Sequence, residues 1–170
     1  MHRFMHILAV LGAARPTEAE EEAARRAGEL AARCGWAVLT GGGGGVMAAA
    51  SRGAAEAGGL TIGILPGTGP DGEYPNPWVR VPIFTGLGSA RNVVNVLSGT
   101  LCLAIGGRTG TLSEVAHALK AGREVWWLWP WLLEPPGGHP PPAVRCFHDQ
   151  EELLPVLREH LTAAVTRPAT

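Results

Sequence analysis

One stretch of the chain combines glycines, hydroxyl groups and a carboxylate in a way that suits phosphate chemistry. It runs from Ile105 to Glu114 (IGGRTGTLSE), after an apolar run that predicts a buried strand at 100–104 and into a predicted helix at 112–121. Glycine lets a backbone approach a ligand closely, and a helix start offers unpaired N–H groups and a positive dipole end. The carboxylate of Glu114 falls about one turn into that helix. We expect the phosphate seat to comprise Gly106, Gly107, Gly110 and Thr111.

Three side chains in this helix have competing interpretations. Glu114 is the candidate catalytic acid, but an acid in a first helical turn also stabilises the helix dipole by about 0.3–1 kcal/mol. Thr111 offers a hydroxyl and an N–H to an oxyanion, or it caps the helix, as Ser113 does less directly. His117 follows Glu114 by three residues on the same face, so it contacts Glu114 or simply packs, and we favour packing.

A second glycine cluster, Gly41–Gly45, follows a predicted strand at 36–40 and precedes a predicted helix at 46–57. A tight turn needs fewer than five successive glycines, which favours a turn that faces a phosphate or a ribose. No lysine follows, so the cluster is not a P-loop, and no acid lies about twenty residues further on to hold a dinucleotide ribose. We therefore expect Gly41, Gly42, Gly43 and Gly44 to bind a nucleotide-like ligand, and we disfavour an NAD site.

Arg91 lies at a third predicted turn into a helix, within the sequence GSARN. A planar guanidinium suits phosphate or carboxylate recognition; the alternative is a solvent-exposed arginine. Asn92 and Asn95 follow, as amide hydrogen-bond partners of a ligand or as ordinary caps. Arg91 and Asn92 are therefore candidate ligand-binding residues.

Composition narrows the class of protein. The 170 residues predict a single domain spanning 1–170, and a formal net charge of −1 argues against a nucleic-acid binder. Three scattered cysteines indicate no disulfide framework, and the histidines show no metal-ligand spacing, so we expect neither a metal nor a resident cofactor. The opening residues lack the pattern of a signal peptide, and no run is long enough to span a membrane, which favours a cytoplasmic protein.

Strand-like and helix-like segments alternate along the chain. We expect strands at 7–11, 36–40, 60–65, 79–84, 100–104 and 124–129, and helices at 16–34, 46–57, 88–97, 112–121 and about 150–163. Pro82 predicts that its strand lies at an edge or ends there. The alternation of strands and helices predicts an α/β fold with a Rossmann-like, doubly wound parallel sheet in three α/β/α layers. Both glycine clusters then lie at the carboxyl edge of the sheet, where such folds bind ligands.

Four segments in this order resemble the LOG-like superfamily, whose members have been called possible lysine decarboxylases. They are Thr40–Met47, Gly63–Gly67, Ala90–Asn92 and Gly106–Glu114. One branch comprises the LOG phosphoribohydrolases, with the signature PGGxGTxxE; the other comprises molybdenum-cofactor carrier proteins. The chain departs from the LOG pattern at Ile105, at Arg108-Thr109 and at Ala90–Asn92, and the last two departures favour the carrier branch.

The resemblance implies a nucleoside 5′-monophosphate phosphoribohydrolase, in which Glu114 stabilises the ribosyl cation and Arg91 holds the substrate or promotes departure of the base. The alternative is a non-catalytic binding or carrier protein for molybdenum cofactor or a nucleotide. A lysine decarboxylase is excluded by the single lysine, Lys120, which lies well inside a predicted helix. The expected partners are a phosphate-bearing small molecule and, by resemblance, a second copy of the chain in a homodimer or a higher homo-oligomer.

Overall fold

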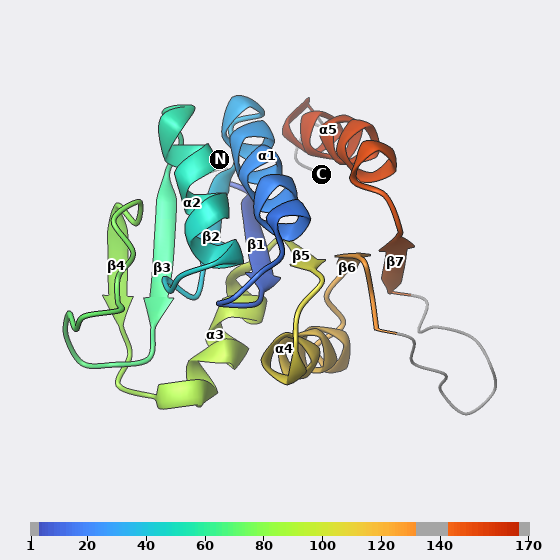
Figure 1. Cartoon of the computed structure of the whole chain (residues 1–170). Helices are drawn as coiled ribbons and strands as arrows, with labels where there is room; N and C mark the ends of the chain where they lie inside the picture. The colour runs from blue at the N-terminus through green and yellow to red at the C-terminus, as the bar shows by residue number, and fades with distance from the viewer. Residues whose placement is uncertain (1–3, 132–142, 167–170) are drawn as a thin grey trace.

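The computed structural model describes residues 4–131 and 143–166. Seven parallel strands form one sheet in the order β4-β3-β2-β1-β5-β6-β7 (Figure 1). The strands are β1 (Ile7–Gly12), β2 (Ala37–Thr40), β3 (Thr61–Leu65), β4 (Val81–Phe84), β5 (Leu101–Ile105), β6 (Val125–Leu128) and β7 (Val144–Phe147). The strand order reverses between β1 and β5, where Gly12 pairs with Ile105. The predicted doubly wound α/β architecture is therefore confirmed.

Helices cover both faces of the sheet. The helices are α1 (Glu18–Arg33), α2 (Val46–Glu56), α3 (Arg91–Ser98), α4 (Thr109–Lys120) and α5 (Gln150–Thr166), with a 3₁₀ turn at Gly88–Ala90 before α3. One buried cluster joins α1, α2 and α5 to side chains such as Leu103 and Trp126. A second cluster joins α3 and α4 to alternate residues of the same strands, such as Cys102 and Trp127. The alternation follows from the two-residue period of a strand.

Local sequence accounts for several boundaries. Thr17 caps α1 in a reciprocal capping box with Glu20, as a threonine followed three residues later by a glutamate predicts. Asp149 accepts a hydrogen bond from the N–H of Glu151 at the start of α5. Pro82 lies in β4 at one edge of the sheet, as predicted. Edge strands tolerate the missing backbone donor of a proline.

The structure corrects two expectations about elements. Helix α4 begins at Thr109, three residues before the predicted start at 112, because the turn from β5 is completed by Gly106 and Gly107 alone. Strand β7 was not predicted: its four residues include exposed Arg145 and follow a proline-rich segment, so no apolar run marks it. The predicted loop at 130–142 lies mostly outside the described residues.

Helices α1 and α2 pack with their backbones in close contact. A Cβ atom added to Gly28 would lie 2.1 Å from the carbonyl oxygen of Ala50, and one added to Gly53 would lie 1.9 Å from that of Arg25. Any side chain at either glycine would push the helices apart. In Figure 1 the two helices lie side by side across β1, β2 and β3.

Candidate functional site

A cavity of about 420 Å³ opens at the carboxyl ends of β1, β2 and β5. It lies at the reversal of strand order, which is where doubly wound folds bind ligands. Its size suits a small molecule. Its lining comprises Val10, Leu11, Gly12, Ala13, Ala14, Arg15, Gly41, Met47, Arg91, Asn92, Arg108, Gly110, Thr111 and Glu114.

Arg91 is a buried cation in this lining. Its side chain is only 9% exposed, and its Nη1 atom donates to the carbonyl oxygen of Ile64 at 3.1 Å. No acidic side chain pairs with it within 4.0 Å among the described residues. Gly41 makes room for it, since a Cβ atom there would lie 1.8 Å from Nη1. Buried charges are ordinarily paired, which makes Arg91 a candidate anion-binding residue.

The cavity wall carries an excess of positive charge. Arg15 follows β1 and Arg108 precedes α4, and both are exposed. Neither takes part in an ion pair within residues 4–131 and 143–166. With Arg91 they make three arginines in the cavity lining against one acidic residue, Glu114. Guanidinium groups bind phosphate oxygens well because they offer several N–H donors in one plane.

The first turn of α4 adds backbone donors to this wall. Its first three residues are Thr109, Gly110 and Thr111, and the cap residue Arg108 gives them no side-chain acceptor. Thr111 is therefore not the helix cap, and Ser113 donates its hydroxyl to the carbonyl oxygen of Gly110 instead. The free N–H groups point out of the helix start, where an anion is stabilised.

Glu114 is 8% exposed and lies in the second turn of α4, so it is not a first-turn acid. Burial raises the pKa of its carboxyl, and a hydrogen bond from Asn95 and the charge of Arg91 partly offset the increase. Asn95 Nδ2 lies 3.2 Å from Glu114 Oε1. His117 is exposed, so the expectation that it packs is wrong, and it makes no hydrogen bond to Glu114 among the described residues.

The predicted binding residues divide into two groups. The structure brings Gly41, Arg91, Asn92, Gly110, Thr111 and Glu114 together at the cavity. Five other predicted glycines are not among the residues that line it: Gly42, Gly43, Gly44, Gly106 and Gly107. The carbonyl oxygens of Gly42 and Gly43 accept hydrogen bonds from the backbone N–H and the side-chain amide of Asn76. These bonds serve the turn itself; direct ligand binding by the five glycines stays a prediction.

Sequence reasoning missed the loop after β1, which contributes Ala13, Ala14 and Arg15 to the cavity. The sequence does contain a signal for this loop. Gly12 ends the first strand, and the carboxyl end of that strand lies on the same sheet edge as both glycine clusters. Met47, on α2, also lines the cavity. An apolar side chain at a helix start carries no comparable signal.

The described residues, 4–131 and 143–166, show neither a membrane-spanning helix nor a metal-binding cluster. These residues contain no helix long and apolar enough to cross a membrane. They contain no group of three or more His, Cys, Asp or Glu side chains placed to hold a metal ion.

Known proteins resemble the chain over most of its length. A molybdenum cofactor binding protein from the phototrophic bacterium Rippkaea orientalis is 36% identical, with a TM-score of 0.80 over 95% of this chain and 100% of that one. The Moco carrier protein of Chlamydomonas reinhardtii is 37% identical, with a TM-score of 0.77 over 95% and 99%. An uncharacterised protein of Archaeoglobus fulgidus is 41% identical over 118 residues, 69% of this chain and 76% of that protein.

The match to a protein family extends over most of the chain, well beyond any single motif. Residues 5–151 match the model of the SLOG cluster4 family, and the resemblance to the LOG-like superfamily is thereby confirmed. The chain belongs to the SLOG cluster4 family.

Proposed function

We propose that the cavity binds a phosphate-bearing pterin, the molybdenum cofactor, and that the protein carries it without chemical turnover. The observation that carries this proposal is Arg91, a buried guanidinium with one backbone acceptor and no acidic partner among the described residues. The two relatives that bind or carry molybdenum cofactor match nearly the whole chain at 36% and 37% identity, which supports this class of ligand.

The polar groups of the cavity suit the two ends of such a ligand. Arg91 and the first turn of α4 present donors to a phosphate group. Glu114 presents carboxylate oxygens to the N–H groups of a pterin ring, and Met47 offers an apolar contact. The cofactor is the cargo in this proposal, and the residues of the chain hold it through hydrogen bonds and charge.

A second function has one observation in its favour. Glu114 is a buried carboxyl in the same cavity as Arg91, and burial raises its pKa. Such a group could act on a nucleoside 5′-monophosphate whose phosphate lies on Gly110 and Thr111. The bond between C1′ and the base breaks, water adds to C1′, and the base leaves with a proton. The carboxylate would stabilise the positive charge that develops on the ribose.

One preparation tests both functions. The protein is purified from a host that makes molybdenum cofactor, and the denatured supernatant is analysed for oxidised pterin by fluorescence and for nucleotides by chromatography. The same protein is incubated with a panel of nucleoside 5′-monophosphates, and free base is quantified. We expect bound pterin and no release of base.

Three results would contradict the proposal that the protein carries a pterin. Release of base that disappears in Glu114→Gln establishes the phosphoribohydrolase. Bound nucleotide without pterin and without release of base rejects the pterin as the ligand. The absence of pterin, nucleotide and turnover rejects both functions. Two further expectations, a cytoplasmic location and a homodimer, stay predictions. Sedimentation of the purified protein would test whether it is a homodimer.

A further inference from the structure

Two tryptophan side chains hold the turn between β5 and α4. Trp127 Nε1 donates to the carbonyl oxygen of Gly106 at 3.0 Å, and Trp131 Nε1 donates to the carbonyl oxygen of Gly107 at 3.0 Å. Trp127 lies in β6, which is paired with β5, and Trp131 follows that strand. Two successive peptide groups of the glycine turn thus accept hydrogen bonds from two indoles, one in the neighbouring strand and one just after it.

These bonds determine where the turn presents its N–H groups. In a trans peptide the C=O and N–H bonds point in opposite directions, and the only cis peptide of the described residues is elsewhere, at Tyr74-Pro75. With the Gly106 oxygen on Trp127, the N–H of Gly107 points away from that indole. With the Gly107 oxygen on Trp131, the N–H of Arg108 points away likewise.

Both N–H groups lack an acceptor. Among the described residues the N–H groups of Gly107 and Arg108 make no hydrogen bond, whereas the adjacent N–H of Gly106 donates to Leu128. Gly106 and Gly107 have φ angles of +50° and +100°, which glycine adopts readily. The unpaired donors directly precede the free donors of the first turn of α4 and lie beside Arg108, whose side chain lines the cavity.

We propose that Trp127 and Trp131 are positioning residues of the phosphate seat. By fixing the two carbonyl oxygens, they orient the N–H groups of Gly107 and Arg108 toward a phosphate bound at the start of α4. This inference rests on the proposed function insofar as the ligand carries a phosphate; it does not depend on whether that ligand is a pterin or a nucleotide.

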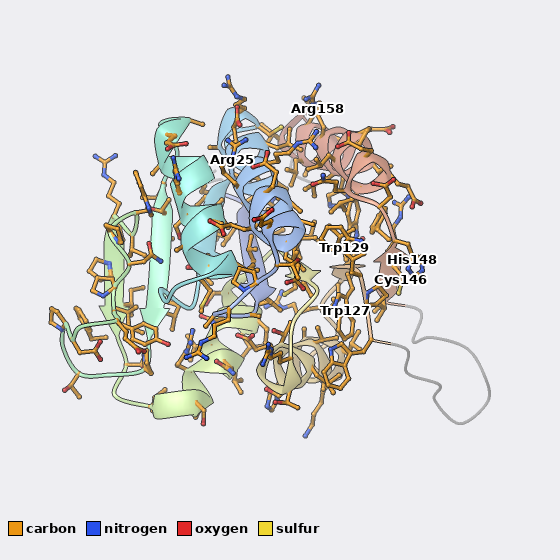
Figure 2. All side chains as sticks on the ribbon, viewed as in Figure 1. Arg25, Trp127, Trp129, Cys146, His148 and Arg158 are labelled. Carbon is orange, nitrogen blue, oxygen red and sulfur yellow. The ribbon has the colours of Figure 1, made fainter. Side chains whose placement is uncertain are left out.

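Trp131 is the better residue to test, because its side chain is 39% exposed and contributes little to the core. Trp127 is 3% exposed and packs against α4, so its replacement would also disturb folding. Trp129 is a matched control: it lies between the two, and its Nε1 donates to the carbonyl oxygen of His148 at 2.9 Å instead of to the glycine turn. Figure 2 shows Trp129 beside His148, and Trp127 nearer to α4.

The experiment compares Trp131→Phe with Trp129→Phe in the full chain. Phenylalanine keeps an aromatic ring and removes the N–H donor. Inorganic phosphate is titrated into ¹⁵N-labelled protein, and the backbone amide signals of Gly107 and Arg108 are followed. We expect phosphate to shift both signals in the original protein. Loss of one hydrogen bond predicts that Trp131→Phe weakens phosphate binding roughly three- to tenfold, while Trp129→Phe leaves it unchanged.

The outcomes separate this inference from the proposed function. Equal phosphate affinity in Trp131→Phe and Trp129→Phe would overturn the inference, as would phosphate shifts at Thr111 without shifts at Gly107 and Arg108. Failure of the protein to bind any phosphate would also overturn it. Phosphate binding that depends on Trp131, in a protein that binds no pterin, would uphold the inference and reject only the proposed cargo.

Discussion

Asn95 donates a hydrogen bond to Glu114, yet its own carbonyl oxygen, Oδ1, has no hydrogen-bond partner among the described residues. Asn95 is fully buried, so this arrangement satisfies only one end of its amide. A rotated amide would accept a hydrogen bond from a protonated Glu114 with the same oxygen. The pair can therefore hold the carboxyl in either protonation state, and burial raises the pKa of that carboxyl.

The pH dependence of stability tests the state of Glu114. Its pKa in the folded protein lies above the ordinary value of 4.5 because of burial. As pH rises from 4.5 through the folded pKa, the unfolded chain has lost a proton that the folded protein still holds, so the free energy of unfolding falls. Glu114→Gln removes this titration. We expect thermal unfolding of the variant at a higher temperature than the parent at neutral pH.

The comparison is made without ligand across the acid range, with Asn95→Leu as a second variant. Asn95→Leu removes the donor that favours the carboxylate, so the loss of stability should extend to higher pH. If the unfolding temperatures of Glu114→Gln and the parent protein run parallel from pH 4 to 8, Glu114 does not titrate as predicted.

Two glycines of one turn provide a sharp test of Arg91. An alanine at position 41 would place its Cβ 1.8 Å from Nη1 of Arg91, which must then move out of its buried position. An alanine at position 44 would meet its nearest atom, the oxygen of Ala14, at 3.9 Å. We expect Gly41→Ala to weaken phosphate binding at least tenfold and Gly44→Ala to leave it within twofold, estimates based on the loss of one charged contact. Calorimetric titration measures both.

Removal of the Arg91 charge should affect binding more than folding. Hydrogen bonds to charged groups contribute about 1.5–3 kcal/mol, so Arg91→Met should weaken phosphate binding about tenfold or more. The unliganded protein loses a bond to Ile64 but also a buried charge without an acidic partner, so its stability should change by less than about 1 kcal/mol. Arg52→Met is the control, since Arg52 is exposed and paired with Glu56. A large loss of stability with unchanged binding would assign Arg91 to the core instead.

Two glycines, one in the turn before α4 and one in its first turn, have opposite expected effects on stability. Gly107 has a φ of +100°, and its Cβ would lie 2.4 Å from that of Thr111, so Gly107→Ala should cost about 1–3 kcal/mol. Gly110 lies within the helix with nothing within 4 Å of an added Cβ. Gly110→Ala should therefore stabilise the protein by about 0.5–1 kcal/mol. Urea denaturation distinguishes the two; destabilisation by both would show that the α4 start is more constrained than its geometry indicates.

Much of the fold follows from local patterns. Continuous apolar runs such as 101–105 mark buried parallel strands, and glycines after strands mark the carboxyl edge of the sheet. These two signals suffice to bring Gly41, Arg91 and Glu114 to one cavity. They fail for β7, whose short sequence contains Arg145 and Cys146 on an exposed edge.

The parts of the site that the sequence does not predict depend on contacts between residues far apart in the chain. The hydrogen bond between Trp131 and Gly107 spans 24 residues, and that between Asn95 and Glu114 spans 19. Each depends on the pairing of β5 with β6 or the packing of α3 on α4, neither of which a local pattern encodes. Among four tryptophans near β6, only the three-dimensional structure distinguishes Trp127 and Trp131, which hold the turn, from Trp129, which does not.

The close backbone contact at Gly28 and Gly53 has a mechanical consequence for the cavity. Because the two backbones touch, a side chain at either glycine would change the spacing of α1 and α2. The loops that lead into these helices supply Arg15 and Gly41 to one side of the cavity. A substitution that separates the two helices would therefore displace this side of the cavity relative to the starts of α3 and α4, which form the opposite side.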